Sequence, residues 1–232
     1  MIVDILVTEV TAMYGENVCV GAINVASREC VRLNVPQPTQ TLVRELGIAQ
    51  GVRLTVDWRR DDKAVAPHNE DGVWDPATVT IIGRPKYENV VRFLSQRAFS
   101  FVEEAFGPRW IQGTGGSAAW KPEQGERSLA TVSVRRLHAY SKQERSGGRV
   151  DFTDSRGFRW TMVPLKDLSV DVHRSSCPQC KEHHAENCAL EFDSTEPTIV
   201  RLGLARPESM GDRPLACWLQ VTNIFARPRT HF

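Results

Sequence analysis

Apolar and polar side chains alternate through residues 52–59, and this period of two constrains the fold more than any other feature of the chain. The apolar positions are Val52, Leu54, Val56 and Trp58, and each is followed by a charged or polar residue. Successive side chains of a β-strand point to opposite faces, so this alternation predicts a strand with one buried face.

Other stretches of the first ninety residues have the same character. Residues 26–28 form a turn-like break between two of these stretches, which predicts a β-hairpin. The additional predicted strands are residues 2–10, 18–23, 29–35 and 78–82. Five short strands joined by tight links favour a small closed barrel.

The pattern changes in residues 88–106, where apolar side chains recur at helical spacing. Gly107 and Pro108 then supply a helix stop signal. We therefore expect one long amphipathic helix whose apolar face caps a barrel. The three glycines in residues 112–117 lack the pattern of a phosphate-binding loop and indicate a connection.

A second set of strand-like runs follows this connection. The turn-like residues 154–157 separate two of them. The runs are residues 129–137, 150–152, 158–162, 199–204 and 217–225. We predict an all-β chain with two barrels: the first in residues 1–87, the helix and connection in 88–127, and the second in 128–232.

Cysteine and histidine are concentrated in residues 177–188, which hold three of the six cysteines and two of the six histidines. The spacing C-x2-C-x3-H-x3-C predicts a zinc site, because zinc prefers four tetrahedral Cys or His ligands. A site closed by four protein ligands is structural, and we place it in an insertion at residues 173–192. The expected ligands are Cys177, Cys180, His184 and Cys188. His183 and His173 are alternatives for the fourth ligand. The alternatives to zinc are another metal or an iron–sulfur cluster, and a polar loop with free thiols.

The N-terminus and the distribution of apolar residues argue against several classes of protein. The N-terminus lacks the basic start and apolar run of a signal peptide, and no apolar stretch approaches the roughly 18 residues that span a bilayer. We therefore expect a cytoplasmic protein that does not bind membranes and whose thiols are reduced, which favours metal binding over disulfides. The other cysteines, Cys19, Cys30 and Cys217, lie in apolar strands and are expected in the core.

The first half contains one concentrated polar cluster, formed by His68, Glu70, Asp71 and Asp75. These residue types serve metal binding or acid–base catalysis, but a run of this kind between strands is more typical of a solvated turn. We find no nucleophile–base signature, paired-carboxylate motif or dinucleotide fingerprint in the sequence. We therefore assign no catalytic residues and do not expect an enzyme.

Basic residues are concentrated in residues 127–159, where eight Lys and Arg stand against three Asp and Glu, with aromatic residues close by. Basic side chains neutralise phosphates, and aromatic faces stack on bases. The residues expected to contact single-stranded nucleic acid are Arg135, Arg149, Phe152, Arg156, Phe158 and Arg159, with Phe152 or Phe158 as the stacking platform. The alternative is a solvated basic face with its aromatic residues in the core.

Short segments across the chain are similar to bacterial proteins described as dual OB-containing. They are residues 18–23 (VCVGAI), 30–33 (CVRL), 66–71 (APHNED), 202–207 (LGLARP) and 217–225 (CWLQVTNIF). The resemblance implies two OB-like barrels and a role related to nucleic acid, and it supplies no catalytic residues. The sequence thus predicts a non-catalytic nucleic-acid-binding module with a structural zinc. The alternative is an adaptor subunit of a bacterial multi-component system, whose barrels dock a catalytic protein partner.

Overall fold

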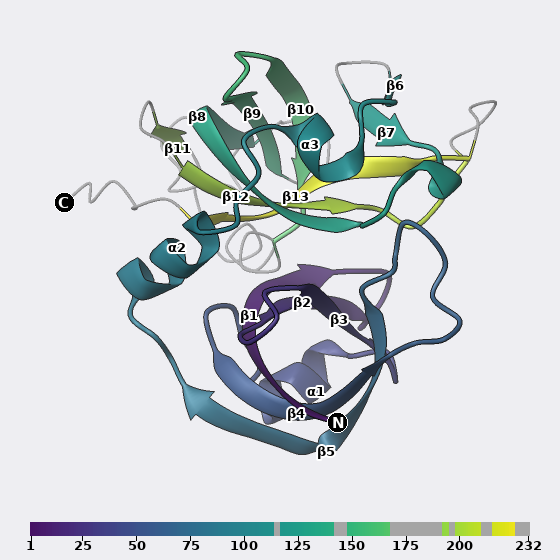
Figure 1. Cartoon of the computed structure of the whole chain (residues 1–232), viewed down its shortest axis with the longest axis vertical. Helices are drawn as coiled ribbons and strands as arrows, with labels where there is room; N and C mark the ends of the chain where they lie inside the picture. The colour runs from purple at the N-terminus through teal and green to yellow at the C-terminus, as the bar shows by residue number, and fades with distance from the viewer. Residues whose placement is uncertain (114–116, 142–147, 168–191, 195–197, 210–214, 226–232) are drawn as a thin grey trace.

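Two β-barrels lie side by side in the computed structural model, which describes residues 1–113, 117–141, 148–167, 192–194, 198–209 and 215–225 (Figure 1). The N-terminal half builds one barrel and the C-terminal half builds the other. The prediction of an all-β fold with two small OB-like barrels is confirmed.

The first barrel is a closed ring in the order β1-β2-β3-β5-β4. Its strands β3 and β5 run parallel, whereas the other neighbours are antiparallel. A short helix lies between β3 and β4 in the chain, as in the OB barrel. The elements are β1 (Ile2–Ala12), β2 (Val18–Asn24), β3 (Cys30–Val35), α1 (Gln40–Glu45), β4 (Arg53–Arg60) and β5 (Asp71–Gly83).

The second barrel repeats this connectivity. Its ring runs β8-β9-β10-β13-β12, and β10 pairs with β13 in parallel, as β3 does with β5. The ring strands are β8 (Leu129–Ser141), β9 (Gly148–Asp154), β10 (Arg159–Leu165), β12 (Thr198–Leu204) and β13 (Cys217–Phe225). The short strands β6 (Ile111–Gln112) and β7 (Ala118–Trp120) extend the sheet beyond β13, and β11 (Phe192–Ser194) pairs with β8.

The single helix expected over residues 88–106 is two helices, α2 (Tyr87–Ser95) and α3 (Val102–Phe106). The helical pattern is interrupted because Phe99 pairs with the second barrel. Its backbone N–H donates to the Thr131 carbonyl, and its carbonyl accepts from the Ser133 N–H, each at 2.9 Å. Sheet pairing at Phe99 satisfies the same backbone groups that a continuous helix would use, so the helix breaks there. The second helix ends at Gly107, as its φ of 95° allows.

Three apolar cores hold these elements together. The inward faces of the two rings form one core each, and α3 adds Phe106 to the second, where its ring lies 5.5 Å from that of Trp120. A third core joins the barrels: Val90 and Leu94 of α2 pack with Leu6 of the first barrel and Ile199 of the second. The helix α2 therefore packs against both barrels and holds one against the other. It lies beside the interface between the two barrels, which we call the seam (Figure 1).

Candidate functional site

Buried polar side chains, rather than apolar ones alone, join the two barrels. Arg201 of β12 donates from Nε and Nη2 to the two carboxylate oxygens of Glu9 on β1, each at 2.9 Å, and both side chains are fully buried. Its Nη1 donates to Thr131 Oγ1 at 2.8 Å. Glu9 has room because its neighbour across the ladder is Gly21, where any Cβ would collide with the carboxylate.

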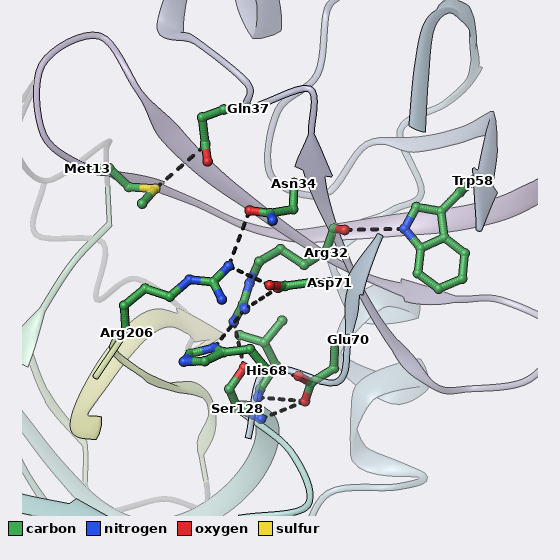
Figure 2. A network of polar contacts seen from close by, with 11 residues as sticks. Met13, Arg32, Asn34, Gln37, Trp58, His68, Glu70, Asp71, Ser128 and Arg206 are labelled. Atoms are coloured by element: carbon green, nitrogen blue, oxygen red, sulfur yellow. Dashed lines mark hydrogen bonds and ion pairs between the residues drawn. The ribbon is translucent and has the colours of Figure 1, made fainter. Parts of the chain in front are cut away.

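A second polar group extends this seam from the loop that precedes β5. Glu70 accepts hydrogen bonds from the backbone N–H groups of Ser128 and Leu129 at 2.7 and 3.0 Å, at the start of β8. Arg32 of β3 donates to Asp71 Oδ1 at 2.7 Å and to Ser128 Oγ at 2.8 Å (Figure 2). The contacts tie β3 and β5 of the first barrel to the first residues of the second.

These contacts correct the interpretation of residues 68–71 as a solvated turn. His68, Glu70 and Asp71 are buried, and each side chain is held by hydrogen bonds in the seam. Asp75 does not join them: it is exposed on β5 and accepts from the N–H of Ala77. The cluster therefore serves as a structural joint, and the sequence pattern alone could not show that a second barrel covers it.

His68 is held in its neutral form. Its pKa is lowered to about 3, first because the ring is buried and then because Arg32 and Arg206 place positive charges beside it. Arg32 Nη1 lies 3.1 Å from Nδ1, and a guanidinium can only donate, so Nδ1 accepts and Nε2 carries the hydrogen. That Nε2 is buried without a hydrogen-bond partner of normal geometry in the described part of the chain. The Ala205 backbone, which lies within hydrogen-bonding reach of the ring, acts to raise the pKa and so opposes this shift.

The predicted arginines of the second barrel spread over its outer surface. Arg135 of β8 and Arg159 of β10 are exposed, and Arg149 of β9 is half-buried between them in the sheet order. Arg159 forms a 3.0 Å ion pair with Asp151, but its side chain is 70% exposed, so the pair is screened by water. The three strands β8, β9 and β10 thus place these arginines on one outer face.

The two predicted stacking residues have different environments. Phe152 is 1% exposed and lies in the barrel core against Trp160, so its ring is not available to a base. Phe158, in the β9–β10 turn, is 41% exposed, with its ring against those of Trp110 and Trp160. Arg156, in the same turn, lies over the ring of Phe101, with its guanidinium carbon 3.4 Å from the ring centre. This contact draws Arg156 towards α3 and away from the face that carries Arg149.

Sequence reasoning missed three residues of the same outer face. Arg136 and His138 of β8 are exposed, and the ring of His138 stacks on that of Tyr140, with centres 5.1 Å apart. The Tyr140 hydroxyl donates to Asp151 Oδ1 at 3.0 Å, which fixes the ring on the surface. The spacing of two between His138 and Tyr140 was a signal that both share one face of a strand. We call Arg135, Arg136, His138, Tyr140, Arg149 and Arg159 the basic face.

The predicted zinc ligands Cys177, Cys180, His184 and Cys188 lie outside the described residues, as do the alternatives His183 and His173. Within the described ranges, no group of three or more His, Cys, Asp or Glu side chains could hold a metal ion. In chain order, the segment that carries these ligands lies between β10 and β11, within the stretch that leads from β10 to the next ring strand, β12. That is the connection in which the first barrel has α1.

The three remaining cysteines are free thiols. Cys217 is in the core of the second barrel, whereas Cys19 and Cys30 are half-buried in the first. Burial raises the pKa of all three thiols above the ordinary value, so they are less reactive than a solvated cysteine. The expectation that all three lie in the core is therefore met fully only by Cys217.

Comparison with known proteins adds no family assignment: no family model matches this chain, and no curated protein is significantly similar to it. The resemblance to dual OB-containing proteins therefore stays a prediction about the family. Among the residues that the structure describes, no helix is long and apolar enough to cross a membrane.

Proposed function

We propose that the basic face of the second barrel binds single-stranded nucleic acid without catalysis. The observation that carries the proposal is the gathering of arginines from three adjacent strands around the stacked pair of the exposed His138 and the half-buried Tyr140, on the outside of an OB-type ring. In OB barrels, the second and third strands form the face that binds oligonucleotides, and here those strands are β9 and β10.

Charge supports this assignment. The basic face carries Arg135, Arg136, Arg149 and Arg159, and Asp151 contacts two of its members, Tyr140 and Arg159. Arginine contacts phosphates in any sequence, while the stacked rings of His138 and Tyr140 offer a π-face to a base. The site should therefore favour single strands, whose bases are free to stack, over duplex.

The test is a fluorescence anisotropy titration of labelled oligo-dT and oligo-U at two salt concentrations. Arg149→Glu together with Arg159→Glu should weaken binding to every sequence. It should also flatten the plot of log K against log salt by about 1.4, because each lost phosphate contact removes roughly 0.7 for single strands. The matched control is Arg44→Glu with Arg92→Glu, which makes the same charge change on exposed residues of α1 and α2.

If the control weakens binding as much as the test variant, the attraction is one of net charge and the proposed face is wrong. If the wild type binds neither oligonucleotide at low salt, the proposal fails. The barrels would then be better explained as docking surfaces for a protein partner, as in an adaptor subunit.

We propose in addition that residues 177–188 hold one structural zinc through Cys177, Cys180, Cys188 and a histidine, first of all His184. The support is their spacing and their number, since four protein ligands leave no open position for a reaction. This proposal agrees with a cytoplasmic location, where thiols stay reduced.

A further inference from the structure

A pocket of about 400 Å³ lies at the seam, on the outer face of β2 and β3 of the first barrel. Its walls on that side come from Glu9, Thr11 and Ala12 of β1, from β2 and β3, from the β1–β2 turn with Met13 and Tyr14, and from His68 of the β4–β5 loop. In OB barrels, these strands and loops form the ligand-binding surface. Here the opposite wall comes from β12 and β13 and the loop between them, so the space suits a small molecule rather than a polymer.

The floor of the pocket is fixed by ion pairs. Asp71 receives Arg32 on Oδ1 at 2.7 Å and Arg206 on Oδ2 at 2.5 Å, so two guanidinium groups share one carboxylate. Arg206 also contacts Asn34 Oδ1 at 3.3 Å from the same Nη2 (Figure 2). The buried Glu70 adds a second negative charge near Arg32.

Two buried donors that line this space, Arg32 Nε and Thr222 Oγ1, have no hydrogen-bond partner in the described part of the chain. His68 Nε2 lacks a partner of normal geometry, although the Ala205 backbone lies close enough to act on the ring. His68 is 3% exposed and neutral, and because its Nδ1 accepts from Arg32, the Nε2 is a fixed N–H donor. Buried polar groups are nearly always paired in folded proteins, so these donors indicate an acceptor that the pocket receives.

The mouth of the pocket adds a cation and an apolar wall. Lys166, which follows β10, is exposed and forms no ion pair with any described residue. Glu208 is the acidic residue on the same rim. Met13, Tyr14 and Pro207 supply apolar surface, and Tyr14 is 96% exposed. An aromatic ring left in water beside a pocket can cover a flat ligand.

We propose that this pocket binds a small phosphate monoester with a flat ring, of the size of a nucleoside monophosphate. The phosphate lies against Arg206, Lys166 and the Nε2–H of His68, and the ring lies along Met13 and Tyr14. A phosphate is preferred over a carboxylate because its three terminal oxygens and its charge of about −2 can engage Arg206 and Lys166 together with donors from both barrels, including Thr222. The site is separate from the basic face, so it does not depend on the proposed binding of nucleic acid.

The proposal is tested by isothermal titration calorimetry of the full chain with AMP and UMP, with inorganic phosphate and benzoate as comparison ligands. At least one nucleotide should bind at least tenfold more tightly than either comparison ligand. Lys166→Met and Thr222→Val should each weaken that binding at least fivefold. Thr222→Val should leave the melting temperature near the wild-type value, because the hydroxyl it removes has no partner in the described chain.

Two controls separate this site from other sources of binding. Lys121→Met removes an exposed lysine that does not line the pocket and should leave the affinity unchanged. Arg149→Glu with Arg159→Glu should also leave it unchanged, while it weakens oligonucleotide binding. Equal affinity for benzoate, or for inorganic phosphate, overturns the assignment of a ring-bearing phosphate. No binding at millimolar concentration, or binding that Lys166→Met and Thr222→Val do not weaken, overturns the site itself.

Discussion

Arg201 and Glu9 are 192 positions apart in the chain, yet they form a bidentate ion pair in which both side chains are completely buried. The pair joins β12 of the second barrel to β1 of the first. Removing both charges from water is costly, so each residue depends on the other for its place in the seam. The pair therefore favours the state in which the two barrels are packed together, because separating them would leave each charge without its partner.

Arg201→Met should destabilise the protein by about 3–5 kcal/mol, because it leaves the Glu9 carboxylate buried without its partner. Urea denaturation followed by tryptophan fluorescence and by circular dichroism measures the loss. Arg59→Met is the control, since Arg59 is 62% exposed and its pair with Asp62 is loose at 3.7 Å. That variant should cost no more than about 1 kcal/mol. Equal losses in the two variants would contradict a structural role for the buried pair.

Stability should fall as the pH drops below about 6.5, and His68 should account for part of the fall. The folded state holds the pKa of His68 at about 3, so the ring binds a proton in the unfolded chain well before it does in the folded one. Each pH unit between these values favours unfolding by up to about 1.4 kcal/mol. The effect is absent above the unfolded pKa and is complete only near pH 3.

The measurement is the free energy of unfolding at pH 7.5 and at pH 5.5, a range in which ordinary carboxylates remain ionised. His68→Asn keeps an acceptor near Nδ1 for Arg32 and should reduce the difference between the two pH values. His138→Asn changes an exposed histidine and serves as the control. If the two variants show the same pH dependence, His68 is not the group that responds.

Tyr140→Ala should weaken binding of single-stranded nucleic acid by about 1–3 kcal/mol, the usual contribution of one stacked base. Tyr140→Phe keeps the ring but loses the hydrogen bond to Asp151, so it should bind nearly as well as the wild type. Anisotropy titrations at one fixed salt concentration compare the two variants. A loss of the same size in both would point to the hydroxyl and against stacking.

Purified protein should contain about one zinc per chain by elemental analysis, and Cys180→Ser should lower that content. Zinc binding requires deprotonated thiols, so the content should also fall in acid. Cys19→Ser is the control, because Cys19 lies in β2 of the first barrel. Alanine variants of His173, His183 and His184 identify the fourth ligand. Protein that carries no metal after gentle purification would refute the site.

The sequence by itself determined where the ring strands of the two barrels lie, because burial on one face of a strand leaves a pattern of period two in the chain, whereas β6, β7 and β11 are too short to show it. Residues 52–58 show it plainly: Val52, Leu54 and Val56 are all fully buried. The end of the helical segment at Gly107 could be predicted for a similar local reason, since few residues other than glycine adopt its positive φ. The helix α1 was missed because six residues are too few for a helical period to stand out.

Only the tertiary structure decided where the polar residues lie. Nothing in the local pattern at residues 68–71 shows that β8 covers them, and Phe152 has the same aromatic character as Phe158 although one is buried and the other exposed. The break at Phe99 and the pairing of Glu9 with Arg201 likewise depend on contacts between residues far apart in the chain. Periodicity reports which face of an element is apolar, whereas burial of a charge depends on what packs against it, and that is set by the meeting of the two barrels.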